Sequence, residues 1–220
     1  MALHRTMAEQ VRITVFTLLL LGAPLTAVAA DVGETLYYAC ATCHREDGSG
    51  SQPLDAPRIA GTASWYVIDQ LGKFKNGSRG DHPDDIYGRQ MALFAKALAD
   101  DASIESVANY VSNLDGPRAQ ASLAGDAKRG QQLYTTCSAC HGEDAEGQAD
   151  LRAPALAGLD DWYLVRQLQN YLAGRRGYAA DDVTGQQMRA AAAVLETEQD
   201  VRDVATYLAS LDAVIRSEPR

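Results

Sequence analysis

The sequence predicts an all-α fold built from two tandem domains that are related by internal duplication. The first observation is a repeat at a constant offset of 97 residues, which runs without a gap from Gly33 and Gly130 to Asp115 and Asp212. The second is the recurrence of apolar residues at steps of three and four, which is typical of helices with one buried face. The third is that strand signals are weak throughout the chain.

The repeat consists of short identical motifs that occur in the same order in both halves. The matching pairs are Trp65-Tyr66 with Trp162-Tyr163, Gln70-Leu71 with Gln167-Leu168, Gly77-x-Arg79-Gly80 with Gly174-x-Arg176-Gly177, and Gln90-Met91 with Gln187-Met188. We therefore predict domains over residues 31–115 and 127–220. Residues 116–126, with Gly116-Pro117 at their head, form the predicted linker, which is short enough that the domains should touch.

Each half is expected to contain three helices in the same order. The first leads into a cysteine motif from about Gly33 or Gly130, and the second runs from Trp65 to Gly77 or from Trp162 to Gly174. We expect a capping pair, Thr197 with Asp200, to begin the third helix of the second half, with Asp100 in the equivalent place in the first. The third helix has a regular apolar face, formed by Ile104, Val107, Tyr110, Val111 and Leu114 and by Val201, Val204, Tyr207, Leu208 and Leu211.

All four cysteines belong to two C-x-x-C-H motifs. The motifs are Cys40-Ala41-Thr42-Cys43-His44 and Cys137-Ser138-Ala139-Cys140-His141. This spacing is typical of covalent c-type haem attachment, in which both cysteines form thioethers and the histidine binds the iron. The sequence therefore predicts two covalently bound haem c groups, held by Cys40, Cys43, Cys137 and Cys140, with His44 and His141 as axial ligands.

Met91 and Met188 are the candidates for the opposite axial position of each iron. They are the only methionines after residue 30, and each follows its motif histidine by 47 residues. Methionines also fill gaps in cores, but their duplication in register favours ligation. His82, in the polar turn Asp81-His82-Pro83-Asp84, is the one competitor and has Ala179 as its counterpart.

Further residues are candidates for supporting each haem. Pro57 and Pro154, each 13 residues after a motif histidine, could offer a backbone carbonyl to the outer N–H of that histidine. The Trp-Tyr pairs fit either a haem crevice or core packing at a helix start. Arg79 and Arg176 fit either haem propionates, since guanidinium forks suit carboxylates, or a solvated loop.

The first thirty residues are predicted to be an export signal. Arg5 and Arg12 precede the apolar run Ile13–Leu21, and Val28-Ala29-Ala30 resembles a cleavage site. The run before Pro24 is about half the length that spans a bilayer, although an uncleaved anchor stays open as the alternative. Because haem is attached outside the cytoplasm, the signal and the motifs together predict the periplasm.

Size and charge limit the remaining functional classes. Domains of this size bury little apolar surface on their own, and a covalent haem in each would compensate. Removal of the signal changes the formal net charge from −9 to −10. An acidic protein is not expected to bind nucleic acid, and it should dock with partners that present basic patches.

These features together resemble the dihaem class I cytochromes c, and in particular the cytochrome c4 family. The resemblance covers the whole chain after the signal. It implies two α-helical monohaem domains related by a pseudo-twofold axis, His44 with Met91 and His141 with Met188 as axial pairs, and propionates that approach one another between the domains. Family members are soluble or peripherally membrane-held periplasmic carriers, which implies a quinol-oxidising complex as donor and a haem–copper oxidase or other reductase as acceptor.

Three functions compete at this point. The leading interpretation is an electron carrier rather than an enzyme. The second is a cytochrome subunit of a periplasmic dehydrogenase or respiratory complex, which would have the same haem domains. The third is a dihaem enzyme such as a peroxidase, which needs an axial position that can open and acid–base groups beside it. The paired methionines count against the third class, and the absence of a fifth cysteine counts against a thiosulfate-oxidising haem enzyme.

Overall fold

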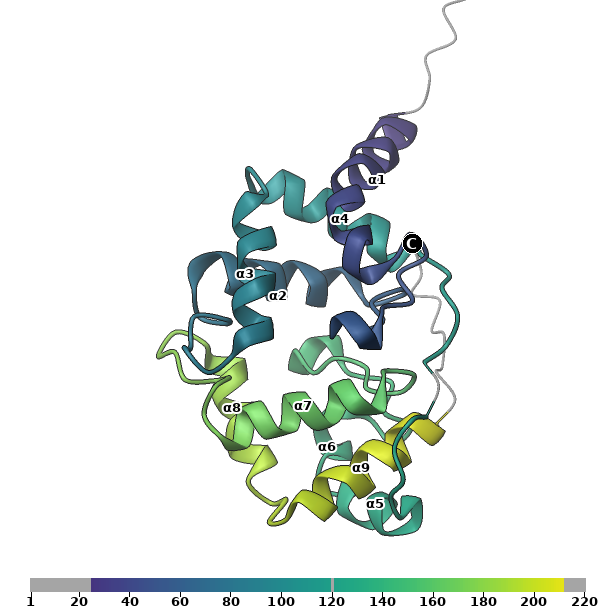
Figure 1. Ribbon diagram of the computed structural model, residues 1–220, viewed down its shortest axis with the longest axis vertical. Coiled ribbons are helices and arrows are strands. Elements are labelled where there is room, and N and C mark those ends of the chain that lie inside the picture. Colours follow the sequence, from purple (N-terminus) through teal and green to yellow (C-terminus); the bar gives the residue numbers. More distant parts are fainter. Residues whose placement is uncertain (1–24, 120, 212–220) are drawn as a thin grey trace, which may run out of the picture.

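The computed structural model describes residues 25–119 and 121–211, which form two helical halves joined by an extended segment (Figure 1). The first half contains α1 (Leu25–His44), the short 3₁₀ helix η1 (Gln52–Leu54), α2 (Ser64–Asn76), α3 (Ile86–Ala97) and α4 (Asp101–Ser112). The second contains α5 (Ala127–Tyr134), α6 (Ser138–His141), the 3₁₀ helix η2 (Ala149–Leu151), α7 (Asp161–Leu172), α8 (Val183–Ala192) and α9 (Glu198–Ser210).

Each half is closed by contact between its first and last long helices. In the first half α1 packs against α4, and α2 packs against both α3 and α4. In the second half α5 packs against α9, and α7 packs against both α8 and α9. Each half therefore has a core of its own, in which the apolar face expected from the sequence is buried. That face contributes Ile104, Val107 and Val111 to the first core and Val201, Val204 and Leu208 to the second.

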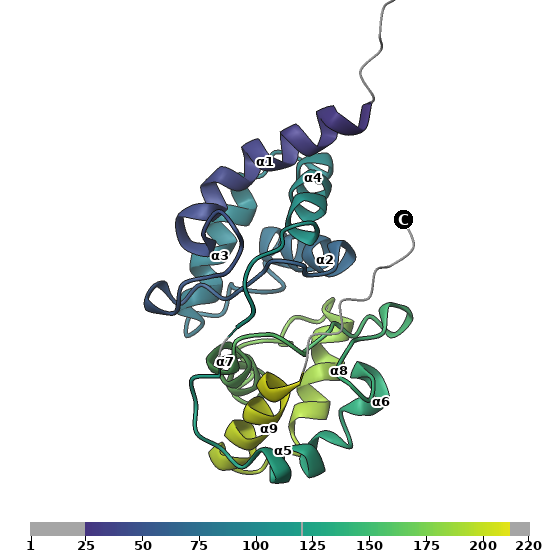
Figure 2. The same ribbon diagram turned by 90° about the vertical axis from the view of Figure 1, so that its right-hand side faces the viewer.

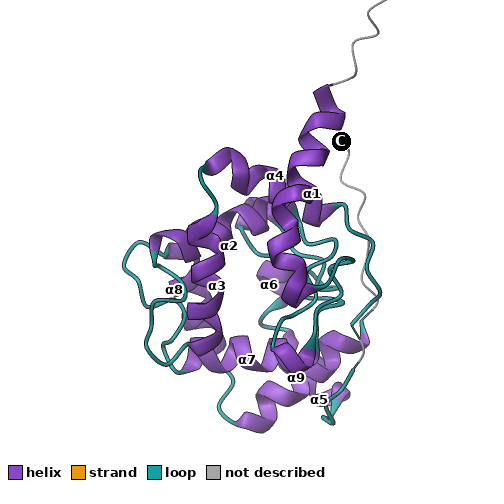
Figure 3. Cartoon of the chain, turned by 45° about the horizontal axis from the view of Figure 1, so that its top comes forward, coloured by secondary structure: helices purple, strands orange, loops and turns teal. Residues whose placement is uncertain are grey.

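The expected all-α class and tandem arrangement are confirmed. No strand occurs within residues 25–119 and 121–211, where isolated bridges pair Ser51 with Ala56 and Gln148 with Ala153 (Figure 3). The capping prediction at Thr197 is also confirmed, because Thr197 and Asp200 form both hydrogen bonds of a capping box. Asp100 caps α4 by accepting a hydrogen bond from the Ser103 amide.

Several expected boundaries are corrected by the structure. The first helix of the first half begins at Leu25 rather than near Gly33, and its counterpart is broken into α5 and α6. The second helix of the second half ends at Leu172, before Gly174. The sequence interpretation also missed two helices, α3 and α8, which carry Met91 and Met188.

The two halves face each other through α2 and α7 (Figures 1 and 2). The predicted linker, residues 116–126, is non-helical where it is described and runs along one side of the boundary (Figure 2). Asp161 of α7 anchors this segment by accepting hydrogen bonds from the amides of Ser122 (2.6 Å) and Leu123 (2.7 Å). The expectation that the halves touch is confirmed by a separate contact, because Lys73 of α2 pairs with Asp182 of the second half at 2.9 Å.

The predicted export signal lies largely outside the described residues. Its apolar run, 13–21, belongs to residues 1–24, and α1 begins at Leu25. Across the described chain, no helix combines the length and apolar character needed to cross a membrane.

Candidate functional site

The two C-x-x-C-H motifs occupy equivalent places in the chain of each half. The first ends α1, and the second begins just before α6 and ends with it. None of the four cysteines forms a disulfide. The thiols are therefore free to form the thioether bonds that the motifs predict. Burial raises the pKa of Cys40 and of Cys137.

Each motif histidine is held in one orientation by a backbone carbonyl. The Nδ1–H of His44 donates to the Pro57 carbonyl at 2.8 Å, and that of His141 donates to the Pro154 carbonyl at 2.8 Å. Both predicted supporting contacts are thus confirmed. Because Nδ1 donates, Nε2 carries the lone pair that can bind a metal. Burial lowers the pKa of both imidazoles and so favours the neutral, ligating form, although the proline carbonyls oppose this effect.

A tight loop after each motif brings the proline back to the histidine. In the first half the Gly50 amide donates to the His44 carbonyl at 3.0 Å. Gly50 has a φ of +80°, and a Cβ at this position would lie 2.5 Å from the backbone nitrogen of Arg58. Only glycine therefore fits this turn, and Gly147 repeats the geometry with a φ of +80°.

One buried tyrosine in each half holds the backbone just after the motif histidine. The sequence interpretation missed this role. The Tyr37 hydroxyl donates to the Arg45 carbonyl at 2.8 Å, and the Tyr134 hydroxyl donates to the Gly142 carbonyl at 2.8 Å. Burial raises the pKa of both phenols, so they stay protonated donors. The repetition of Tyr37 as Tyr134 at the 97-residue offset was the available signal.

The two candidate methionines lie on helices that pack against the cores bordering the motifs. Met91 of α3 is partly buried against the same apolar cluster as Cys40, and Met188 of α8 against the same cluster as Cys137. Each helix is capped at its start by an aspartate, Asp85 or Asp182, which accepts from the backbone amide three residues later at 2.9 Å. The caps hold the two helices in equivalent positions.

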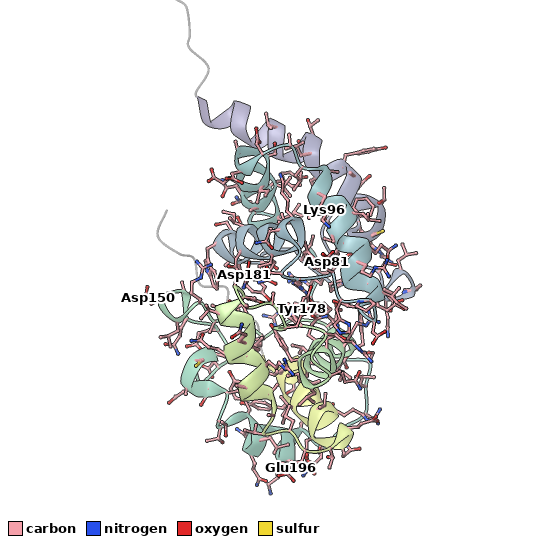
Figure 4. The ribbon with its side chains drawn as sticks, turned by 90° about the vertical axis from the view of Figure 1, so that its left-hand side faces the viewer. Asp81, Lys96, Asp150, Tyr178, Asp181 and Glu196 are labelled. Atoms are coloured by element: carbon pink, nitrogen blue, oxygen red, sulfur yellow. The ribbon has the colours of Figure 1, made fainter. Side chains whose placement is uncertain are left out.

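His82 lies at the boundary between the halves. Its ring contacts the ring of Tyr178 at 5.8 Å between centroids, and its Nδ1 accepts from the Asp84 amide at 3.2 Å. The Tyr178 hydroxyl donates to the Gly77 carbonyl at 2.7 Å and accepts from the Asp81 amide at 3.1 Å, and Figure 4 shows Tyr178 and Asp81 facing each other across the boundary. His82 therefore contacts the opposite half, whereas Met91 packs on the core of its own half.

Arg79 and Arg176 meet in a buried network between the halves. Arg79 donates to Gln70, Tyr163 and Gln167 at 2.5, 3.2 and 3.1 Å, respectively. Arg176 donates to Gln167, Tyr66 and Gln70 at 2.9, 3.1 and 2.8 Å. The arginines are only 7% and 5% exposed, so the solvated-loop interpretation is wrong. The interface role of Tyr66 and Tyr163 was also missed.

This network lacks negative charge. No salt bridge of the described residues involves Arg79 or Arg176, and the Arg79 Nε is buried without a hydrogen-bond partner. Two buried guanidinium groups with neutral partners are costly unless a counter-charge is supplied. Carboxylates such as haem propionates would fit this need, so the residues present suit a haem in each half: free thiols, neutral imidazoles with an available Nε2, and buried cations.

The repeated motif, its proline-held histidine and the helical frame define a tandem c-type cytochrome. The chain belongs to the cytochrome c family, whose sequence model matches residues 30–115 and 127–212. More particularly, it is a dihaem protein similar to cytochrome c4. Cytochrome c4 from Pseudomonas aeruginosa is 37% identical over 199 residues, which cover 89% of this chain and 94% of that protein.

Two solved structures agree with this assignment. Reduced recombinant cytochrome c4 from Pseudomonas stutzeri superimposes with a TM-score of 0.67 at 27% identity, over 83% of this chain and 98% of that one. The thiosulfate dehydrogenase TsdBA from Marichromatium purpuratum gives a TM-score of 0.69 at 29% identity, over 84% of this chain but 40% of that one. The chain is therefore an electron-transfer protein that carries two covalently bound haem c groups.

Proposed function

We propose that this protein shuttles single electrons in the periplasm between a respiratory donor complex and a terminal oxidase or reductase. The haems supply a one-electron iron couple when bound. Cys40 and Cys43 would hold the first haem and Cys137 and Cys140 the second. His44 with Met91, and His141 with Met188, would be the axial pairs. On this proposal, residues 1–30 are a cleaved export signal, and the haem domains span residues 31–115 and 127–220.

The observation that carries the proposal is the fixed orientation of both motif histidines. A 2.8 Å hydrogen bond to Pro57 or Pro154 commits each Nδ1 and leaves Nε2 as the metal-binding nitrogen. A methionine on the opposite side raises the potential and fills the coordination sphere, which suits a carrier rather than a catalyst. The helix contacts of the two halves are equivalent, because α2 packs on α3 and α4 as α7 packs on α8 and α9, and this supports two similar carrier units.

Redox proteins are the partners that this proposal requires. A quinol-oxidising complex would be the donor and a haem–copper oxidase the acceptor. A relative from Bradyrhizobium, 29% identical over 162 residues, is named as a cbb3-type cytochrome c oxidase subunit, FixP. That likeness supports an oxidase acceptor, and it also supports a role as a cytochrome subunit within a larger complex.

The proposed ligands can be tested by absorption spectroscopy during a potentiometric titration. Ferric haem with a bound methionine sulfur has a weak red band. We expect full intensity from two haems in the wild type, about half in Met91→Ala, and about half in Met188→Ala, each with one lowered potential. His82→Ala is the matched control and should keep the full band. Retention of the full band in both methionine variants would refute the axial assignment.

A second candidate is a dedicated acceptor of electrons from thiosulfate oxidation. A relative from Stutzerimonas stutzeri is named as a thiosulfate dehydrogenase electron acceptor. It is 29% identical over 184 residues, and the aligned region covers 79% of this chain and 79% of that protein. Such an acceptor would use the same two haems, and its substrate would be oxidised by a separate enzyme.

Reduction assays distinguish these functions from catalysis by the chain itself. The ferric protein should not be reduced by thiosulfate alone, and it should be reduced rapidly once a thiosulfate dehydrogenase is added if the second candidate is correct. Rapid reduction only by a quinol-oxidising complex would support the first candidate. Turnover of thiosulfate or peroxide without another enzyme would overturn both.

A further inference from the structure

The centre of the interface between the halves is the same from either side. Each half contributes a tyrosine, a glutamine and an arginine at positions related by the 97-residue offset, and the bonds they form across the boundary are images of one another. Arg79 reaches Tyr163 and Gln167, while Arg176 reaches Tyr66 and Gln70. This centre would accept two copies of the same half as readily as two different halves.

The ion pairs around this centre have opposite polarity on the two sides. Asp55 pairs with Arg166, and Arg152 pairs with Asp69 at 2.5 Å. Position 152 is the repeat equivalent of position 55, and position 166 is the equivalent of position 69. The two salt bridges are therefore pseudo-twofold images in which acid and base have changed places.

This reversal has a direct consequence for pairing. Two copies of the first half in the same arrangement would oppose Asp55 to Asp69 twice, and two copies of the second half would oppose Arg152 to Arg166 twice. Both salt bridges would thus become like-charge contacts in either homotypic pair. Only a first half against a second half gives opposite charges at both places.

One further salt bridge crosses the boundary, and it opposes this preference only in part. Lys73 pairs with Asp182 at 2.9 Å, and its pseudo-twofold image is the Asn170 amide near Asp85 at 3.5 Å. A pair of first halves would place Lys73 near Asp85 twice, which adds one favourable charge pair. That addition does not compensate for two like-charge contacts, and a pair of second halves has no such addition.

We propose that the interdomain surface selects its partner, so that each half fits the opposite half of this chain and excludes a second copy of itself. The symmetric centre supplies the shape, and the reversed salt bridges select the partner. This is discrimination by unfavourable alternatives. The inference concerns the protein surface and does not depend on which residues ligate the irons.

The size of the preference follows from ordinary ion-pair strengths. A partly exposed pair changes an equilibrium constant by a factor of about 1.5 to 5, and a like-charge contact acts in the opposite sense by a similar factor. Exchange of two favourable for two unfavourable contacts should therefore favour the mixed pair by roughly fivefold or more. The preference should weaken at about 1 M salt, where the screening length is about 3 Å.

The test uses the haem-loaded protein with a protease site placed at residues 119–121, so that the chain can be cut after folding. Native mass spectrometry of the cut protein at low salt should show first–second complexes and almost no homotypic ones. Mixing with isotope-labelled cut protein then reveals which halves exchange partners. A statistical mixture of all three pairings, or halves that separate outright, would overturn the proposal.

Two double variants with the same net charge sharpen the test. Asp69→Arg with Arg166→Asp makes each half complementary to itself, so homotypic complexes should become the major species. Asp69→Arg with Arg152→Asp gives opposite charges at both places in every pairing, so selection should be lost and all three complexes should form in nearly statistical proportions. It also controls for the local loss of the Asp69–Lys73 pair, which spans 2.8 Å. Mixed pairing retained in the first variant, with native haem spectra, would refute selection by charge.

Discussion

Arg176 of the second domain donates a hydrogen bond of 2.8 Å to the side-chain oxygen of Gln70 in the first. The same oxygen accepts from Arg79 at 2.5 Å, so one neutral amide group bridges two guanidinium groups. Gln167 does the same from the other side, at 3.1 and 2.9 Å. The network thus brings two positive charges together in a buried place, and the iron centres should experience that charge.

Replacement of Arg176 by methionine should lower the reduction potential of at least one haem. A buried positive charge favours the ferrous over the ferric state, so its removal favours oxidation. The change also leaves Tyr66 and Gln70 with unmet hydrogen-bonding capacity, which should cost about 1–3 kcal/mol of unfolding free energy. Potentiometric titration and chemical unfolding measure the two effects.

Arg175→Met is the matched control for this prediction. Arg175 is the neighbouring residue and is only partly buried, and its backbone amide donates to the Asn170 carbonyl at 2.8 Å. It should shift the potentials little. Equal shifts in the two variants would show that the total protein charge, rather than the buried network, sets the potential.

The arginines also show where sequence-based prediction ends. The histidine–proline hydrogen bonds were predictable because both partners lie within 13 residues and recur in both halves. The burial of Arg79 was not, because two of its three hydrogen-bond partners lie more than 80 residues away in the other half. Within one half, its motif resembles a solvated turn.

The helix that carries Met91 was missed for a different reason. Isolated amphipathic patterns predict helices when apolar residues gather on one face. On α3, Ile86 and Leu93 are about 70% exposed, while the buried positions are Gly88, Ala92 and Ala95. Small residues are buried because α3 packs closely on α2, and only the folded structure reveals that contact.

Two glycines within helices should respond oppositely to alanine. A Cβ at Gly130 of α5 would lie 2.0 Å from the Asp203 carbonyl oxygen of α9, whereas a Cβ at Gly72 of α2 would meet nothing within 4 Å. Gly130→Ala should therefore destabilise the protein by about 1–3 kcal/mol through overpacking. Gly72→Ala should stabilise it by about 0.5–1 kcal/mol through helix propensity. Denaturant unfolding tests both, and a loss of stability in Gly72→Ala would contradict the second expectation.

Asp161→Asn should loosen the linker from α7. The carboxylate accepts from the amides of Ser122 and Leu123 and from the Ser122 hydroxyl at 2.7 Å, and also from its own helix at the Trp162 amide. An amide side chain has one acceptor oxygen and cannot satisfy all four donors. We expect a loss of about 1–3 kcal/mol of unfolding free energy and faster proteolysis within residues 116–126. Gln169→Glu, an exposed change of similar size on the same helix, is the control.

The Asp161 contribution should also depend on pH. Burial alone would raise the pKa of this carboxyl, but the hydrogen bonds from Ser122, Leu123 and Trp162 outweigh burial and hold the pKa below its ordinary value. A carboxyl whose pKa is lower in the folded state stabilises the protein fully above its unfolded pKa, near 3.9, and loses that effect as the pH falls through the folded pKa. The neighbouring Asp160 has a raised pKa, chiefly because it is buried, and it works in the opposite sense.

The informative quantity is therefore the difference in unfolding free energy between wild type and Asp161→Asn. It should be constant from pH 7 to about pH 5 and shrink below about pH 4. A difference that stays constant down to pH 2 would mean that the ionised carboxylate contributes nothing beyond the shape of the side chain.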